Sequence, residues 1–170
     1  MRGNRFAFVL VALAAVAVVL IGCGGGKGSG SEAAKPAEPS GPSPAEQGQA
    51  MGQEIITAFD ETVAEAAALL AGKPAPEELL PQLEALFTKA EARMTELNGR
   101  YLELRAADVE AFGACNSYID EYRPKSVHAK DMAFGDFIGH YRFENPNPEV
   151  EEFLTGNSLA ALIDLATKKQ

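Results

Sequence analysis

From residue 45 onward, apolar side chains recur every three or four residues, which is the spacing of one face of an α-helix. The clearest stripe has near-heptad spacing and charged flanks. It consists of Leu79, Leu83, Leu86, Ala90, Met94, Leu97, Tyr101 and Leu104. Such a face buries its apolar surface against another helix. Since no segment alternates apolar and polar residues as a half-buried strand does, the pattern predicts an all-α protein.

Start and stop sequences divide this helical region. Ser43-Pro44-Ala45-Glu46 has the form of a capping box with proline at the first helical position, and it predicts a helix over about 45–72. After a proline-rich break, a second long helix is predicted over about 76–122, ending before Pro124. The apolar stripe shifts by one residue near 106–108, which indicates a kink or a short break there.

The C-terminal third is less regular and richer in aromatic residues. Asp131 is placed to cap a short helix reaching Tyr141, Asn147 precedes Pro148 at the start of another, and Ser158 precedes a third. We therefore expect an irregular helical bundle of two long helices, covered by several short C-terminal helices.

The N-terminus has the layout of a secretory signal sequence. Arg2 and Arg5 precede an uninterrupted apolar run over 6–21, and the small residue Gly22 follows. The closing residues Leu20-Ile21-Gly22-Cys23 resemble the lipobox of bacterial lipoproteins. This resemblance covers only residues 1–23.

The resemblance implies three processing steps: transfer of a diacylglyceryl group to the Cys23 thiol, cleavage between Gly22 and Cys23, and fatty acylation of the new amino terminus. It places the chain in the cell envelope, lipid-anchored. In a Gram-negative source, Gly24 after the cysteine favours the outer membrane, facing the periplasm. The alternative is an uncleaved anchor helix, but the apolar run is shorter than the roughly 20 residues of a membrane span.

Composition divides the chain into a signal peptide (1–22), a linker with the lipidated cysteine (23–50) and a helical domain (51–170). The linker is rich in glycine, proline and serine and has no aromatic or β-branched residue, which is typical of disordered segments. The net charge is −9, and loss of Arg2 and Arg5 with the signal peptide makes it −11. Such a charge repels phosphate backbones, so we expect no nucleic-acid partner.

Familiar catalytic and cofactor-binding motifs are missing from the sequence. It has no His-Glu-x-x-His, no phosphate-binding glycine loop, no Gly-x-Ser-x-Gly and no haem-attachment motif. We therefore expect a protein that is not an enzyme and holds no cofactor. If Cys23 carries lipid, Cys115 is left without an intramolecular partner, and its place on a helical stripe favours burial over pairing between molecules.

The two histidines, His128 and His140, are accompanied by Asp131, Asp136 and Glu144. These are metal-ligand types, but the spacing lacks a His pair at i, i+4 and a tight cluster, so we expect no metal site. A pH-sensing role for the histidines is a further alternative.

A candidate partner-binding surface lies within 123–147, where basic and aromatic residues gather in an otherwise acidic chain. Its candidate residues are Arg123, His128, His140, Tyr141 and Arg142. Arginine and aromatic residues are enriched in interface hot spots. Gly135 and Gly139 share one helical face, which suits close packing within the domain or, alternatively, the approach of a partner.

Two functions remain open. The leading hypothesis is a membrane-anchored lipoprotein that presents a small non-enzymatic helical interaction or scaffold domain to a protein or cell-envelope partner. The alternative is a tethered helical bundle that binds a small ligand or metal as a sensor or carrier, which requires Asn116, His128 and His140 to converge. A cell-wall hydrolase is the weakest hypothesis, because the sequence singles out no pair of acidic residues as a catalytic pair.

Overall fold

A computed structural model describes residues 41–156 and 158–168, and every regular element in this part of the chain is helical. The elements are α1 (Pro44–Leu70), α2 (Pro76–Ala107), α3 (Val109–Gly139), the π-helix η1 (His140–Glu144), α4 (Pro148–Thr155) and α5 (Ala161–Ala166). The signal peptide, Cys23 and most of the linker lie outside the described residues.

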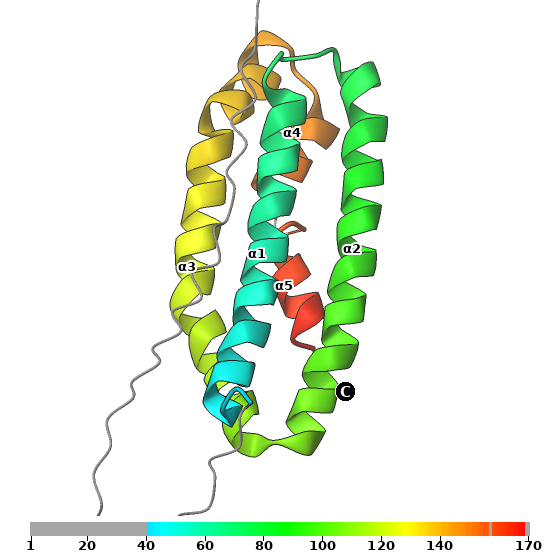
Figure 1. Ribbon diagram of the computed structural model, residues 1–170. Helices are drawn as coiled ribbons and strands as arrows, with labels where there is room; N and C mark the ends of the chain where they lie inside the picture. Colours follow the sequence, from blue (N-terminus) through cyan, green and yellow to red (C-terminus); the bar gives the residue numbers. More distant parts are fainter. Residues whose placement is uncertain (1–40, 157, 169–170) are drawn as a thin grey trace, which may run out of the picture. The chain divides into compact units, whose positions relative to one another are not determined.

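The helices form a bundle in which α1 lies between α2 and α3 (Figure 1). Successive long helices run up, down and up, and the pair α4 and α5 lies behind α1 (Figure 1). α5 packs mainly on α2, and α4 contacts α3. The all-α bundle with short C-terminal helices is therefore confirmed.

The bundle has one continuous hydrophobic core. Every apolar residue of the stripe on α2 from Leu79 to Tyr101 is buried in it, as the heptad spacing predicts. The largest fully buried side chains include Tyr101, Tyr141, Phe59 and Phe134. Because α1 to α5 supply all of the core residues except Tyr141 of η1 and Leu159 just before α5, the described residues contain their own core. Within 41–156 and 158–168, no helix is both long and apolar enough to cross a membrane.

The contact between α1 and α3 is the most extensive in the bundle and depends on two glycines. A Cβ added at Gly48 would overlap the backbone carbonyl of Ala111. One added at Gly52 would lie 2.9 Å from the carbonyl oxygen of Cys115 and 3.0 Å from Cβ of Tyr118. Only glycine allows the two backbones to approach this closely.

The start of α1 follows the capping box. The hydroxyl of Ser43 accepts a hydrogen bond from the backbone N–H of Glu46, and the Glu46 carboxylate accepts from the backbone N–H of Ser43. Residues 44–50, which composition placed in the linker, therefore belong to α1.

The shift in the apolar stripe near 106–108 corresponds to a complete break. Asp108 is extended (φ −149°, ψ 112°), and its carboxylate accepts hydrogen bonds from the backbone N–H groups of Glu110 and Ala111, both 2.9 Å. It is thus the N-cap of α3. The expected helix over 76–122 is two helices.

The prediction that Pro124 ends this region is wrong, because α3 continues through Pro124 to Gly139. The short helix expected from Asp131 is the last part of α3. Buried positions continue past the proline at Ser126, Lys130 and Phe134. Packing against the bundle at these positions holds the helix together where the missing N–H of proline weakens it.

Candidate interaction surface

Three of the five candidate partner-binding residues are consecutive in η1, the π-helical end of α3. The wider turn is closed by a hydrogen bond of 2.9 Å from the backbone N–H of Asn145 to the carbonyl of His140. Turns of this kind change the direction in which the following side chains point, and they are frequent at functional sites.

Tyr141 is fully buried, so its assignment as a partner-contacting residue is wrong. Its hydroxyl donates a hydrogen bond of 2.8 Å to the carbonyl of Pro74, next to Lys73, whose φ is 47°. Burial raises the pKa of the Tyr141 hydroxyl. Tyr141 therefore fixes η1 to the turn between α1 and α2.

His140 is also largely inside, with its side chain 13% exposed. Its Nδ1 lies 2.7 Å from Oε2 of Glu144, while Nε2 is buried and has no hydrogen-bond partner among the described residues. The hydrogen bond with His140, together with the positive charge of Lys73 3.7 Å away, lowers the pKa of Glu144. These contacts join the two ends of η1 to each other and join Glu144 to Lys73.

His128 is exposed, and it precedes His140 by twelve residues along nearly continuous helix. At 1.5 Å per residue they are about 18 Å apart along the axis. Asn116 is engaged elsewhere, accepting a hydrogen bond of 2.7 Å from the Tyr101 hydroxyl. The convergence that the carrier hypothesis requires is not formed. No three His, Cys, Asp or Glu side chains within the described ranges could together hold a metal ion.

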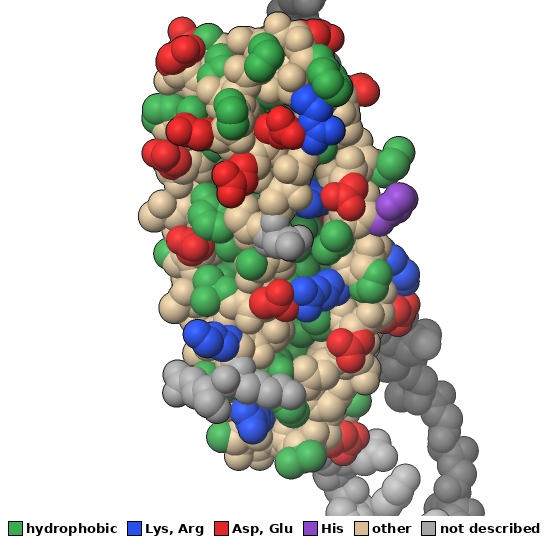
Figure 2. Space-filling model, turned by 180° about the vertical axis from the view of Figure 1, so that it is seen from behind, with side chains coloured by type: hydrophobic (Ala, Val, Ile, Leu, Met, Phe, Trp, Pro, Cys, Tyr) green, Lys and Arg blue, Asp and Glu red, His purple; other side chains and the backbone are tan. Residues whose placement is uncertain are grey.

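Arg123 and Arg142 are engaged in ion pairs within the domain. Nη1 of Arg123 lies 2.6 Å from Oδ1 of Asp164 in α5, and Nη2 of Arg142 lies 2.6 Å from Oε1 of Glu151 in α4. Most other cations of the described residues are paired as well: Lys73, Lys89, Arg93, Arg100, Lys125 and Lys130. Acidic side chains are spread over the face in Figure 2, with basic ones beside some of them. The expected basic patch is therefore neutralised, and the surface is mainly acidic.

An exposed strip lies along the end of α3 and into η1, where the guanidinium of Arg142 lies 5.9 Å from the centre of the Phe143 ring. Its large residues are Met132, 72% exposed, and Phe143, 75% exposed. Met132 and Gly139 are seven residues apart on nearly the same face of α3, and Phe143 follows four residues later, within η1. Gly135 and Gly139 lie between Met132 and Phe143, and a Cβ added at either glycine would meet nothing within 4 Å. We call these four residues, with the exposed Asp136 among them, the α3 strip.

The open surroundings of Gly135 and Gly139 exclude one of their two interpretations, and the approach of a partner stays a prediction. Close packing of these glycines onto the long helices is wrong, because a Cβ added at either one would meet nothing within 4 Å. The sequence offered the glycine spacing as a clue to this surface. The sequence did not reveal that Met132 and Phe143 are exposed, because it predicts a separate short helix beginning at Asp131 in place of the continuous α3.

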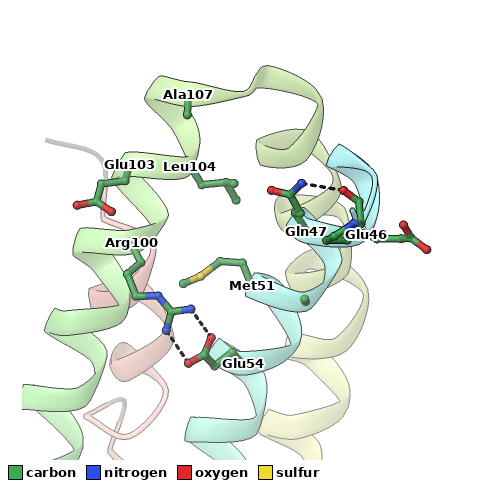
Figure 3. A pocket seen from close by; sticks show the side chains of 10 residues that line it. Glu46, Gln47, Met51, Glu54, Arg100, Glu103, Leu104 and Ala107 are labelled. Atoms are coloured by element: carbon green, nitrogen blue, oxygen red, sulfur yellow. Dashed lines mark hydrogen bonds and ion pairs between the residues drawn. The ribbon is translucent and has the colours of Figure 1, made fainter. Parts of the chain in front are cut away.

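A second surface feature is a shallow groove of about 510 Å³ between the start of α1 and the end of α2 (Figure 3). Met51 and Leu104 line it (Figure 3). The guanidinium of Arg100 donates two hydrogen bonds to the Glu54 carboxylate, at 2.6 and 2.8 Å. Because this carboxylate engages Arg100, the groove offers no free cation for an anionic ligand. The sequence gave no indication of the groove, whose walls come from distant segments.

Comparison with protein-family models, with curated proteins and with solved structures finds no match to this chain. A proposal for its function therefore rests on the sequence, the fold and the α3 strip.

Proposed function

We propose that this chain is a lipid-anchored protein of the bacterial cell envelope whose helical domain binds another protein through the α3 strip. The domain is a non-enzymatic interaction module, held to the membrane by lipid on Cys23. In a Gram-negative source it faces the periplasm from the outer membrane.

The exposure of Met132 and Phe143 on one helical face carries this proposal. Among the described residues only three large hydrophobic side chains are strongly exposed, and the third is Val109 at the opposite end of α3. Met132 and Phe143 lie on either side of the open glycines, with the exposed Asp136 between them, and exposed apolar side chains gathered on one face mark interaction sites more often than isolated ones do.

The N-terminal sequence supports the anchoring part of the proposal. Two or three acyl chains hold a protein stably on a bilayer, where one chain would be marginal. The residues between Cys23 and Ser43 have the composition of a flexible coil with a root-mean-square reach of roughly 25 Å. Confinement near the membrane raises the effective concentration of a partner in the same envelope.

Site-specific photo-crosslinking in living cells tests the interaction. A photoreactive amino acid is placed at position 132, at position 143 or, as the control, at Val109, which is 83% exposed. We expect positions 132 and 143 to give one adduct of the same mass that position 109 does not give. Absence of an adduct from both strip positions, or an identical adduct from position 109, would contradict the proposal.

A further inference from the structure

We infer that the occupant of the α3 strip is an amphipathic helix of a different protein, carrying a Lys or Arg opposite Asp136. This inference rests on the proposed function and adds the chemistry of the partner. It follows from the shape of the strip, from the charge at its middle and from the charge of the whole chain.

The shape of the strip fits a helix. Met132 and Phe143 are separated by about 16 Å along the axis, which is three helical turns. The surface at Gly135 and Gly139 is low, because these residues have no side chain and no neighbour within 4 Å of an added Cβ, and the side chain of Asp136 stands beside it. A row of apolar side chains on a partner helix fits such a depression between two larger residues, in the way that helices pack ridges into grooves.

The charge at the middle of the strip is that of Asp136. It is exposed, and it takes part in no ion pair within the described part of the chain. The nearest cations in sequence, Lys130 and Arg142, are paired with Asp131 and Glu151. A partner that brings its own cation therefore complements this position, and one that brings an acid is repelled.

The same charge argues against a second copy of this chain as the occupant. A two-fold axis through the middle of the strip would bring the Asp136 carboxylates of the two copies together. Both copies would also be acidic overall, at −9 for the full sequence. A heterologous helix with a positive charge avoids both conflicts.

Binding of two synthetic helices to the chain from residue 24 to 170, which contains every described helix, tests the inference. The probe is a peptide of about 18 residues, long enough to cover the strip, with leucine on one face, glutamine elsewhere and one central lysine. The matched peptide has glutamate in place of that lysine. Binding is measured by fluorescence anisotropy near physiological salt.

The wild-type chain should bind the lysine peptide about threefold or more tightly than the glutamate peptide, as for an exposed charge pair. Asp136→Lys should reverse this preference, and Met132→Ala with Phe143→Ala should weaken binding of both peptides. Asp120→Lys is the matched control, because it makes the same charge change at an exposed position of α3 outside the strip. It should keep the wild-type preference.

An unchanged preference in Asp136→Lys, equal reversal in Asp120→Lys, or no binding of either peptide would overturn the inference. So would a dimer of the wild-type chain in sedimentation that Met132→Ala with Phe143→Ala dissociates. Circular dichroism establishes that each variant is folded. If the peptides fail while photo-crosslinks from positions 132 and 143 persist, the partner chemistry is wrong and the proposed function stands.

Discussion

Gly48 and Gly99 are both glycines inside long helices, but only Gly48 is required by its surroundings. At Gly48 an added Cβ would meet the backbone of Ala111, whereas at Gly99 it would meet nothing within 4 Å. The sequence shows two equivalent glycines, and the packing of α1 on α3 makes them different. A backbone cannot move aside as a flexible side chain can, so the difference appears as stability.

Gly48→Ala should lower the free energy of unfolding by about 2 kcal/mol or more, because α1 and α3 must separate to admit the methyl group. Gly99→Ala should raise it by up to about 1 kcal/mol, because alanine favours a helix more than glycine does. Urea denaturation of both variants measures the two effects. Equal effects, or a stabilised Gly48→Ala variant, would contradict the close packing of α1 and α3.

Cys115 is the residue whose chemistry the fold changes most. It is fully buried, and burial raises the pKa of its thiol to about 11 from its usual 9.0. Between these values the unfolded chain is deprotonated and the folded chain is not. This thiol therefore contributes stability below about pH 9 that is lost as the pH rises through about 11.

In the folded chain from residue 24, Cys115 should react with iodoacetamide at pH 8 far more slowly than in urea, because only the thiolate is nucleophilic and the site is closed. Mass spectrometry over time measures both rates. Equal rates in the folded and unfolded chain would show that Cys115 is accessible.

At the scale of the helices, the sequence predicts the start of α1 and the buried face of α2 better than the bounds of α3. The capping box at Ser43 and the stripe on α2 lie where the pattern places them. The length of α3 was not predictable, because two of its buried positions are occupied by Ser126 and Lys130, which interrupt the apolar pattern on either side of His128. These positions are buried because other helices pack against them. The residue pattern of a single helix does not reveal such packing.

Asp108 determines where α2 ends and α3 begins, so its side chain should matter more than an exposed acid usually does. Asp108→Ala removes two hydrogen bonds to backbone N–H groups and should lower the free energy of unfolding by about 1 kcal/mol. Asp108→Asn retains an accepting oxygen and should cost less. Thermal denaturation compares the melting temperatures of the two variants with that of the wild type. An identical melting temperature for wild type and Asp108→Ala would contradict the role of Asp108 as the N-cap of α3.

At the scale of the whole molecule, the fold class could be predicted and the interaction surface only in part. Helical spacing and the lack of strand patterns suffice for an all-α bundle. The tract 123–147 includes the α3 strip, but the expected residues differ from the exposed ones. Tyr141 and His140 turn inward, Arg123 and Arg142 form ion pairs, and Met132 and Phe143 remain outside. Which face of a helix is left uncovered depends on the packing of α4 and α5, which local patterns do not specify.

Fatty-acid labelling of the full-length chain in bacterial cells tests the central claim, that lipid on Cys23 holds the helical domain at a membrane. The wild type should incorporate a clickable fatty acid and sediment with membranes, and Cys115→Ser, the matched control, should do the same. Cys23→Ser should do neither, because its hydroxyl cannot accept the thioether-linked lipid. Label on the Cys23→Ser variant, or an unlabelled wild type, would contradict the account.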